Sequence, residues 1–518
     1  MSARPIFPLL VLVCTLLAGD AWAGDWPMWG RTSARNMASP ETGLVTSFDP
    51  GRLKAGSEDI DLATTRNVKW IQKLGSQAYG NATISNGRIC VGTNNETPRQ
   101  KKIQGDRGVV MCFTESSGSF LWQLTAPKLG AGKVSDWEYL GICSSPAQHN
   151  DRIYVVTNRA EVLCLDAHGM KNGNQGPFKE EGSYMAGPGK PVVAVDPLDA
   201  DILWRFDMRK ELSIFPHNIA SSSVLVVGDR VFVTTSNGVD WSHRNIPSPI
   251  APSLVVLDRK TGALVGEEGS TISERVLHGN WASPALGKVK GRDMVLFGAG
   301  DGYCYGFHPK PKEDADGFPM LPELWRFDGN PKSYRVRDGK PVRYPRRDGP
   351  SEIIGTPVFH DGKVYVVIGQ DPEHGPGVGN LSCIDPSKKG EISESGRVWS
   401  FTKIGRSIST VAIAKGLLFV ADLDGKVYCL DAKTGAHHWT HDTEGRIWSS
   451  PLVADGKVYI GNADGVFTIL EASPTRKILH TVSFVGPIYS SAVAANGVVY
   501  VSTPTHLYAL MDMGGDAK

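Results

Sequence analysis

Two short runs of residues bring together side chains that bind metals, donate hydrogen bonds or stack on rings. His217-Asn218 and His278-Gly279-Asn280-Trp281 each stand just before a small polar residue and an apolar run. Imidazole nitrogens are common zinc ligands, and histidine also exchanges protons near neutral pH. No carboxylate stands at a diagnostic spacing from these histidines. We therefore predict hydrogen-bonded loop histidines and no metal; a two-histidine metal site is the alternative.

Three charged residues stand at one shared register. Glu352, Arg406 and Arg446 each lie four residues before a small polar residue. We expect these side chains to be neighbours at the mouth of a channel, where they form a salt-bridged cluster that closes it. The alternative is a binding site in which the two arginines hold a ligand carboxylate through paired hydrogen bonds.

Aromatic side chains stand two residues before the same small polar residues. Trp281 and Trp448 occupy this register, where their faces can hold a ligand ring. The equivalent residues elsewhere, in chain order, are Tyr79, Cys143, Ser221, Ile354, Ile408 and Tyr489. We assign no catalytic residue. The predicted ligand-binding residues are His217, Asn218, His278, Asn280, Trp281, Glu352, Arg406, Arg446 and Trp448.

Positive charge is concentrated in one segment of an otherwise balanced chain. The 518 residues carry 55 Lys and Arg against 54 Asp and Glu, a net charge of +1. This balance argues against a nucleic-acid partner, because phosphate binding needs a cationic excess. Residues 332–348 nevertheless hold seven basic residues against two aspartates, which predicts either a solvated loop or a patch for an anionic surface.

The elements that must position these residues are strands. Apolar residues alternate with a period of two, between turns rich in Gly, Asp and Asn, and the chain has 58 glycines. One unit recurs, with a small polar residue, a strand, an Asp-Gly or Asn-Gly turn, a second strand, and two further strands around a Thr-Gly turn. The clearest copies are residues 425–439 and 449–461. Asp-Gly and Asn-Gly pairs suit two-residue hairpins, since both positions take positive φ.

The small polar residue recurs eight times, with spacings of 40 to 78 residues. It occupies Asn81, Ser145, Ser223, Ser283, Thr356, Thr410, Ser450 and Ser491. Four strands in about 40 residues predict the blade of a propeller. The eighth copy has room for three strands, and residues 68–74 supply the fourth. We predict an all-β, eight-bladed β-propeller of four-stranded antiparallel blades over residues 66–511, its last blade closed by an N-terminal strand.

The N-terminal residues are typical of an export signal. The apolar run over residues 6–17 is too short to span a membrane, and Ala21-Trp22-Ala23 places small residues where signal peptidase cleaves. We predict a signal peptide over 1–23, cleaved after Ala23, an extension over 24–65 and a tail over 512–518. No later segment has the apolar length of a transmembrane span, so we expect a periplasmic or secreted monomer.

Cysteines follow the repeat. Cys112, Cys164, Cys383 and Cys429 occupy one register, in the strand that precedes the Asp of the unit. A small buried residue fits there, so we predict a packing role. Cys143, at the start of a blade, is the best candidate for a special role.

The run Leu430-Asp431-Ala432-Lys433-Thr434-Gly435, followed by Trp439, carries a family resemblance. It resembles the pyrroloquinoline-quinone (PQQ) type of propeller repeat, over roughly residues 66–511. That family includes quinoprotein dehydrogenases, which bind PQQ and Ca²⁺, and cofactor-free scaffolds such as BamB. The resemblance implies the propeller fold and leaves both functions open.

We expect an exported binding or scaffold propeller without catalysis or a cofactor, whose partner is an envelope or extracellular protein, a small anionic ligand or a sugar. The alternative is a PQQ-dependent dehydrogenase that oxidises an alcohol or sugar, with PQQ and Ca²⁺ at the central funnel. The residues around the quinone would then come from His217, Asn280, Trp281, Glu352, Arg406 and Arg446. The sequence has no Cys-Cys pair, which quinoprotein alcohol dehydrogenases typically carry, and no Cys-x-x-Cys-His haem motif.

Overall fold

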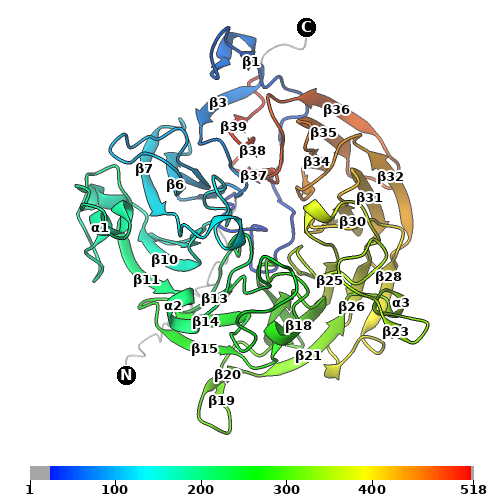
Figure 1. Ribbon diagram of the computed structural model, residues 1–518. Coiled ribbons are helices and arrows are strands. Elements are labelled where there is room, and N and C mark those ends of the chain that lie inside the picture. The colour runs from blue at the N-terminus through cyan, green and yellow to red at the C-terminus, as the bar shows by residue number, and fades with distance from the viewer. Residues whose placement is uncertain (1–23, 515–518) are drawn as a thin grey trace, which may run out of the picture.

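Eight β-sheets stand as blades around a central axis in the computed structural model, which describes residues 24–514 (Figure 1). The predicted eight-bladed propeller is therefore confirmed. The predicted signal peptide lies outside the described residues, as do residues 515–518 of the predicted tail. None of the helices in residues 24–514 is long and apolar enough to cross a membrane.

Each blade contains four antiparallel strands, ordered from the axis outward. The first blade contains β4 (Thr83–Ser85), β5 (Arg88–Asn94), β6 (Arg107–Thr114) and β7 (Phe120–Pro127), and the second contains β8 (Ala147–His149), β9 (Arg152–Val156), β10 (Glu161–Asp166) and β11 (Ile202–Asp207). The third contains β12 (Leu225–Val227), β13 (Arg230–Thr234), β14 (Leu254–Asp258) and β15 (Leu264–Glu268), and the fourth contains β16 (Ala285–Val289), β17 (Arg292–Gly298), β18 (Tyr303–Phe307) and β21 (Glu323–Asp328). The fifth contains β24 (Val358–His360), β25 (Lys363–Val367), β26 (Leu381–Ile384) and β28 (Arg397–Phe401), the sixth contains β29 (Ala412–Ala414), β30 (Leu417–Ala421), β31 (Lys426–Asp431) and β32 (His437–Asp442), and the seventh contains β33 (Leu452–Ala454), β34 (Lys457–Gly461), β35 (Val466–Glu471) and β36 (Ile478–Ser483).

The eighth blade joins the two ends of the chain. Its inner strands are β37 (Val493–Ala495), β38 (Val498–Ser502) and β39 (His506–Leu510), and its outer strand is β3 (Val68–Lys73). β3 pairs antiparallel with β39, with Trp70 opposite Ala509. This closure was predicted from the incomplete last copy, and it leaves no blade short of a strand.

Short extra elements lie in the connections. β20 (Pro319–Leu321) and β19 (Lys312–Glu313) extend the third blade, and β27 (Gly390–Glu391) extends the fourth. Two small hairpins are built from β1 (Arg52–Leu53) with β2 (Ile60–Asp61), and from β22 (Val336–Arg337) with β23 (Lys340–Pro341). The α-helices are α1 (Glu181–Ala186), α2 (Met208–Leu212) and α3 (Lys332–Arg335).

The turns between inner strands have the predicted chemistry. Asp455 and Gly456, between β33 and β34, have φ of 51° and 69°. Asn496 and Gly497, between β37 and β38, have φ of 52° and 77°. Both residues of each pair thus take the left-handed conformation that a tight hairpin requires.

The repeated tryptophan of the outer strand joins neighbouring blades. Trp399 of the fifth blade donates from its indole nitrogen to the carbonyl oxygen of Ala432 in the sixth, at 3.2 Å. Gly435 belongs to the Thr-Gly turn that follows Ala432. It packs on the Trp399 ring so closely that an added Cβ would lie 2.7 Å from the ring. The Thr-Gly turn and the tryptophan therefore form one contact across the blade boundary.

The small polar residues form a ring of hydrogen bonds around the axis. Thr410 donates its backbone N–H to Ser450 Oγ at 2.9 Å, and Ser450 donates in the same way to Ser491 Oγ at 2.7 Å. Ser491 in turn donates to Oδ1 of Asn81, so the last blade is joined to the first. Equivalent bonds join most of the other neighbouring blades.

The segment before the first blade crosses the centre of the propeller (Figure 1). It bonds to the innermost strands of successive blades, from Trp26 with Ile84 in the first to Ser39 with Ala494 in the eighth. Arg35 of this segment is fully buried and donates to the carbonyl oxygens of Pro284 and Val224. One end of the central channel is therefore covered by residues 26–39. Residues 44–48 pack against the seventh blade instead.

Candidate functional site

A cavity of about 370 Å³ lies on the axis, at the ends of the blades where the chain enters each innermost strand. Seven of its lining residues come from the single register two residues before the small polar ring. They are Tyr79, Cys143, Ser221, Trp281, Ile354, Ile408 and Trp448. The register predicted from the repeat is therefore a ring in space, and this ring forms the wall of the pocket.

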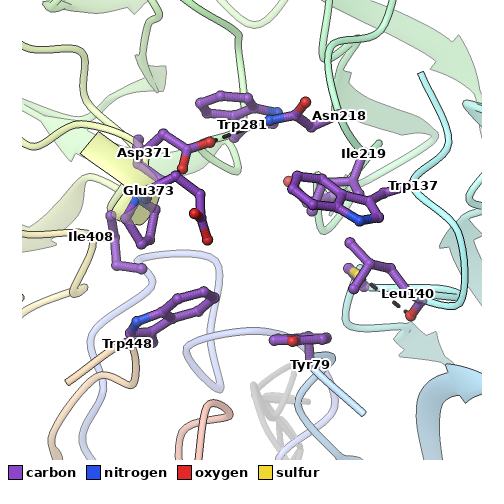
Figure 2. A pocket seen from close by; sticks show the side chains of 14 residues that line it. Tyr79, Trp137, Leu140, Asn218, Ile219, Trp281, Asp371, Glu373, Ile408 and Trp448 are labelled. Carbon is purple, nitrogen blue, oxygen red and sulfur yellow. Dashed lines mark hydrogen bonds between the residues drawn. The ribbon is translucent and has the colours of Figure 1, made fainter. Parts of the chain in front are cut away.

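Aromatic faces dominate one side of the cavity. Tyr79 stacks on Tyr489 with ring centroids 5.1 Å apart, and Trp448 lies 4.8 Å from Tyr489. Trp281 and Trp137 face the cavity from other sides (Figure 2). Trp137 comes from the connection between β7 and β8. A flat ligand ring entering the cavity thus meets aromatic surfaces from several blades.

Two carboxylates bring negative charge to the same cavity. Asp371 is the N-cap of the 3-10 helix η5 (Pro372–His374), and Glu373 lies within this helix, between β25 and β26. Asp371 accepts a hydrogen bond from Asn218 Nδ2 at 3.3 Å (Figure 2). Burial raises the pKa of Asp371 above its usual value. Glu373 is exposed and points into the cavity beside it.

Behind the Trp281 wall, two buried histidines face each other. Nε2 of His278 lies 2.8 Å from Nε2 of His217, and both side chains are almost completely inaccessible to solvent. Nδ1 of His217 donates to the carbonyl oxygen of Val239 at 2.6 Å. Burial lowers the pKa of His217 to about 4 and that of His278 to about 2, so both rings are neutral near pH 7.

Glycine allows these two histidines to meet. The segment that leads out of β13 pairs with the segment that leads into the fourth blade, through Gly238 and Gly279. A Cβ on Gly238 would lie 2.4 Å from the carbonyl oxygen of His278 and 2.7 Å from Cβ of His217. A side chain at position 238 would therefore push these backbone segments apart and separate the imidazoles.

Two further histidines approach from connections. His243 is exposed, and its ring centroid lies 5.0 Å from that of His217 and 4.7 Å from that of His278. Asp240 holds the turn that carries His243, because its carboxylate accepts hydrogen bonds from Ser242 and Asn245. His374, the last residue of η5, stacks on His278 with centroids 5.1 Å apart.

Tyr344 links this histidine cluster to Glu352. Its hydroxyl lies 3.1 Å from Nδ1 of His278 and 3.1 Å from Oε1 of Glu352. The other carboxyl oxygen of Glu352 is buried and has no hydrogen-bond partner among the described residues. Burial raises the pKa of Glu352 to about 8. Tyr344 belongs to the basic segment 332–348, so this segment contributes to the cluster.

The predicted Glu-Arg-Arg group is only partly brought together. Arg406 is buried close enough to Glu352 for its charge to act on that carboxyl. Its terminal nitrogens donate to the carbonyl oxygens of His374, Gly375 and Arg346, so this guanidinium holds two connections rather than a ligand. Arg446 stands before the innermost strand of the seventh blade, and its side chain is exposed.

The remaining predicted residues divide between pocket and scaffold. Asn218, Trp281 and Trp448 line the cavity. Asn280 is fully buried, donates to the carbonyl oxygen of Asn237 and to Ser253 Oγ, and accepts from the backbone of Gly300. The amide nitrogen and oxygen of Asn280 are therefore both occupied by hydrogen bonds within the scaffold.

Several residues of the site lie outside the predicted set of ligand-binding residues. They are Trp137, His243, Tyr344, Asp371, Glu373 and His374. All of them lie in connections between strands, which carry no repeat. The only signal was the length and composition of those connections.

The cysteines mostly pack in the blades. All seven described cysteines are free thiols, and six are buried. Cys143 differs because it lines the cavity, where burial raises its pKa to about 12 and keeps the thiol protonated.

Parts of the chain are similar to two known alcohol dehydrogenases. A stretch of 65 residues is 40% identical to quinohemoprotein alcohol dehydrogenase ADH-IIG of Pseudomonas putida, covering 11% of this chain and 9% of that protein. A stretch of 126 residues is 31% identical to 1-butanol dehydrogenase (cytochrome c) of Thauera butanivorans, covering 23% and 17%. The matches thus span less than a fifth of these relatives.

A solved structure and a family model cover much more of the chain. The crystal structure of BamB from Moraxella catarrhalis superposes with a TM-score of 0.50 at 14% identity, over 87% of this chain and 100% of that one. This likeness shows the fold alone. A family model described as "Outer membrane protein assembly factor BamB" matches residues 28–276 and 379–504, well over half of the chain. The chain therefore belongs to the BamB family of PQQ-like β-propellers.

Proposed function

We propose that this chain is an exported binding propeller that holds a neutral, hydroxyl-bearing ring, such as a sugar, in its central pocket and performs no reaction on it. The observation that carries this proposal is the combination of aromatic faces with two carboxylates in one cavity on the axis. Export is part of the proposal and is supported by the signal-peptide pattern of residues 1–23.

The lining can recognise both faces and edges of such a ring. The C–H face of a sugar is apolar and stacks on Trp448 or Trp281, while its hydroxyl groups donate hydrogen bonds to Asp371 and Glu373. A cavity of about 370 Å³ is within the usual range for small ligands. Pockets of this kind combine an apolar surface with a few polar groups that orient the ligand.

The same lining disfavours an anionic ligand, including PQQ. PQQ is a planar tricarboxylate, and its binding calls for cationic partners. Among the described residues that line the cavity, none is Lys or Arg, whereas two are acidic. Arg406 is committed to backbone carbonyl oxygens. These residues do not fit the quinone, although the local similarity to quinohemoprotein dehydrogenases keeps that function as the second candidate.

The test is a binding titration of the purified chain, by calorimetry, with neutral mono- and oligosaccharides, tetramethylammonium, and PQQ with Ca²⁺. We expect a sugar to bind, and Trp448→Ala to weaken that binding about fivefold, from the loss of about 1 kcal/mol of stacking. Phe318→Ala is the matched control, because Phe318 is an exposed aromatic residue just before β20, outside the pocket.

Two outcomes contradict this function. Saturable binding of PQQ with Ca²⁺, followed by dye reduction with alcohols, would establish the dehydrogenase instead. Binding of tetramethylammonium but of no saccharide would show that the aromatic residues and carboxylates recognise a cation.

A further inference from the structure

We propose that His217, His243 and His278 bind a divalent transition-metal ion, with zinc as the preferred ion. One ring nitrogen of each lies within 4.8 Å of the other two. This site goes beyond the proposed sugar binding, because it lies behind the Trp281 wall and its occupancy is measured without any sugar.

The hydrogen bonds of His217 leave a lone pair where the metal would be. Because Nδ1 of His217 donates to the carbonyl oxygen of Val239, its proton is on Nδ1, and Nε2 is unprotonated. A carbonyl acceptor on the far nitrogen is the usual arrangement behind a metal-binding histidine, since it fixes the tautomer and the orientation of the ring.

His278 has the second type of support, a hydroxyl backed by a carboxyl group. With Tyr344 donating to Glu352, the tyrosine oxygen accepts the Nδ1 proton of His278, and Nε2 of His278 then also presents a lone pair. Two Nε2 lone pairs at 2.8 Å repel each other unless a cation or a proton lies between them. Two nitrogens at about 2.0–2.1 Å from one tetrahedral zinc ion are about 3.3 Å apart, so a small opening of this pair admits the ion.

His243 supplies the third ligand from the solvent side. Its side chain is exposed and stands on a turn held by Asp240, so it can adjust its rotamer without disturbing the blades. Three histidines with one position left for solvent are a common coordination set for zinc. Imidazole nitrogens also favour zinc and copper over Ca²⁺ and Mg²⁺, which prefer oxygen.

One buried polar group beside the cluster has an oxygen that is not yet used. The Glu352 carboxyl stands one tyrosine away from His278 and keeps one oxygen without a partner among the described residues. The alternative is a pair of histidines joined by a simple N–H···N hydrogen bond, which would give no metal affinity.

The experiment uses the full chain after removal of bound metal by a chelator. Zn²⁺ is titrated in competition with a chromophoric chelator, and Co²⁺ is added separately to record its visible absorption bands, which report a tetrahedral nitrogen site. We expect one Zn²⁺ per chain and tetrahedral Co²⁺ bands. His243→Ala should weaken binding at least tenfold and leave the fold intact, because His243 is exposed.

Control variants separate this site from surface binding. His438→Ala removes another exposed histidine, on β32, and should leave the affinity unchanged. Tyr344→Phe should weaken binding about 10–100-fold through the orientation of His278, since Tyr344 is a positioning residue. Zinc should also raise the thermal unfolding midpoint of the original chain and not that of His243→Ala.

The proposal fails if the original chain binds Zn²⁺ no more tightly than His243→Ala does, or if it binds several ions weakly and His438→Ala reduces their number. Preference for Ca²⁺ over Zn²⁺ would also overturn it. These zinc measurements can be interpreted even if the sugar titration fails, because none of them involves a sugar.

Discussion

Glu268 shows how strongly burial controls a single charged residue in this propeller. It lies on β15, is 4% exposed, and accepts hydrogen bonds from the backbone of Ser253 and Ser270. Desolvation outweighs these two bonds and raises the pKa of Glu268 to about 7. Between pH 4.5 and 7 the folded chain therefore holds a proton at this position that the unfolded chain has lost.

This difference predicts a pH-dependent effect of Glu268→Gln. Because the folded state binds more protons in this window, the free energy of unfolding falls as pH rises through it, by about 3 kcal/mol at this residue. Glutamine does not ionise, so the stability of the variant relative to the original chain should rise by that amount from pH 4.5 to pH 7.5. Chemical denaturation at several pH values measures the difference.

The exposed Glu274, in a nearby connection, provides the control. Glu274→Gln should follow the pH profile of the original chain. If Glu268→Gln also follows that profile, Glu268 is ionised in the folded state at ordinary pH.

At the same scale, the sequence predicted the residues of the pocket that obey the repeat. Tyr79, Trp281 and Trp448 share one register, and a register becomes a ring around the axis. His243, Tyr344 and Glu373 obey no period, since they stand in connections whose paths depend on tertiary contacts. Their side chains complete the site, so its chemistry could not be deduced from the repeat alone.

At the scale of elements, the small polar residue before each innermost strand has a structural reason. Its side-chain oxygen accepts the backbone N–H of the preceding blade, as Ser450 does for Thr410. The sequence located this residue in every copy because a strand, a turn and a second strand always follow it. The hydrogen bond that this residue makes could not be predicted, because its partner is about 40 or more residues away in the sequence.

Ser450→Ala should therefore destabilise the propeller. It leaves the buried N–H of Thr410 without an acceptor, which costs about 1–3 kcal/mol. Denaturant unfolding, monitored by tryptophan fluorescence, measures this loss. Ser395→Ala, at an exposed serine before β28, is the matched control and should change stability by no more than about 0.5 kcal/mol.

An unchanged unfolding midpoint for Ser450→Ala would show that the inter-blade bond is replaceable by solvent. Ser450→Thr provides a further check, because it keeps the hydroxyl and should recover most of the stability.

At the scale of the whole molecule, two N-terminal segments hold the ring together. β3 completes the eighth blade through β39, and residues 26–39 cross the axis and bond to the innermost strands. The first was predictable, because a missing strand can be counted. The second was not, since the extension has no repeat and its partners are spread over the entire chain.

Arg35 ties the crossing segment to the blades and should be the most sensitive residue in it. Its guanidinium donates to the carbonyl oxygens of Pro284, Trp29 and Val224 at 2.7 to 2.9 Å, and it is fully buried. Arg35→Ala leaves these oxygens unpaired and opens a cavity, for a loss of about 3 kcal/mol or more. Arg52→Ala, at an exposed arginine on β1, should have no such effect.

Limited proteolysis distinguishes loss of the segment from general unfolding. If the segment acts as a strap, Arg35→Ala should be cut first within residues 26–39, while the blades stay resistant and the pocket, at the other end of the channel, keeps its ligand. Equal cleavage throughout the chain would mean that the blades do not hold together without the strap. Resistance equal to that of Arg52→Ala would show that the hydrogen bonds of Arg35 contribute little, and that apolar contacts such as those of the buried Trp26 anchor the segment.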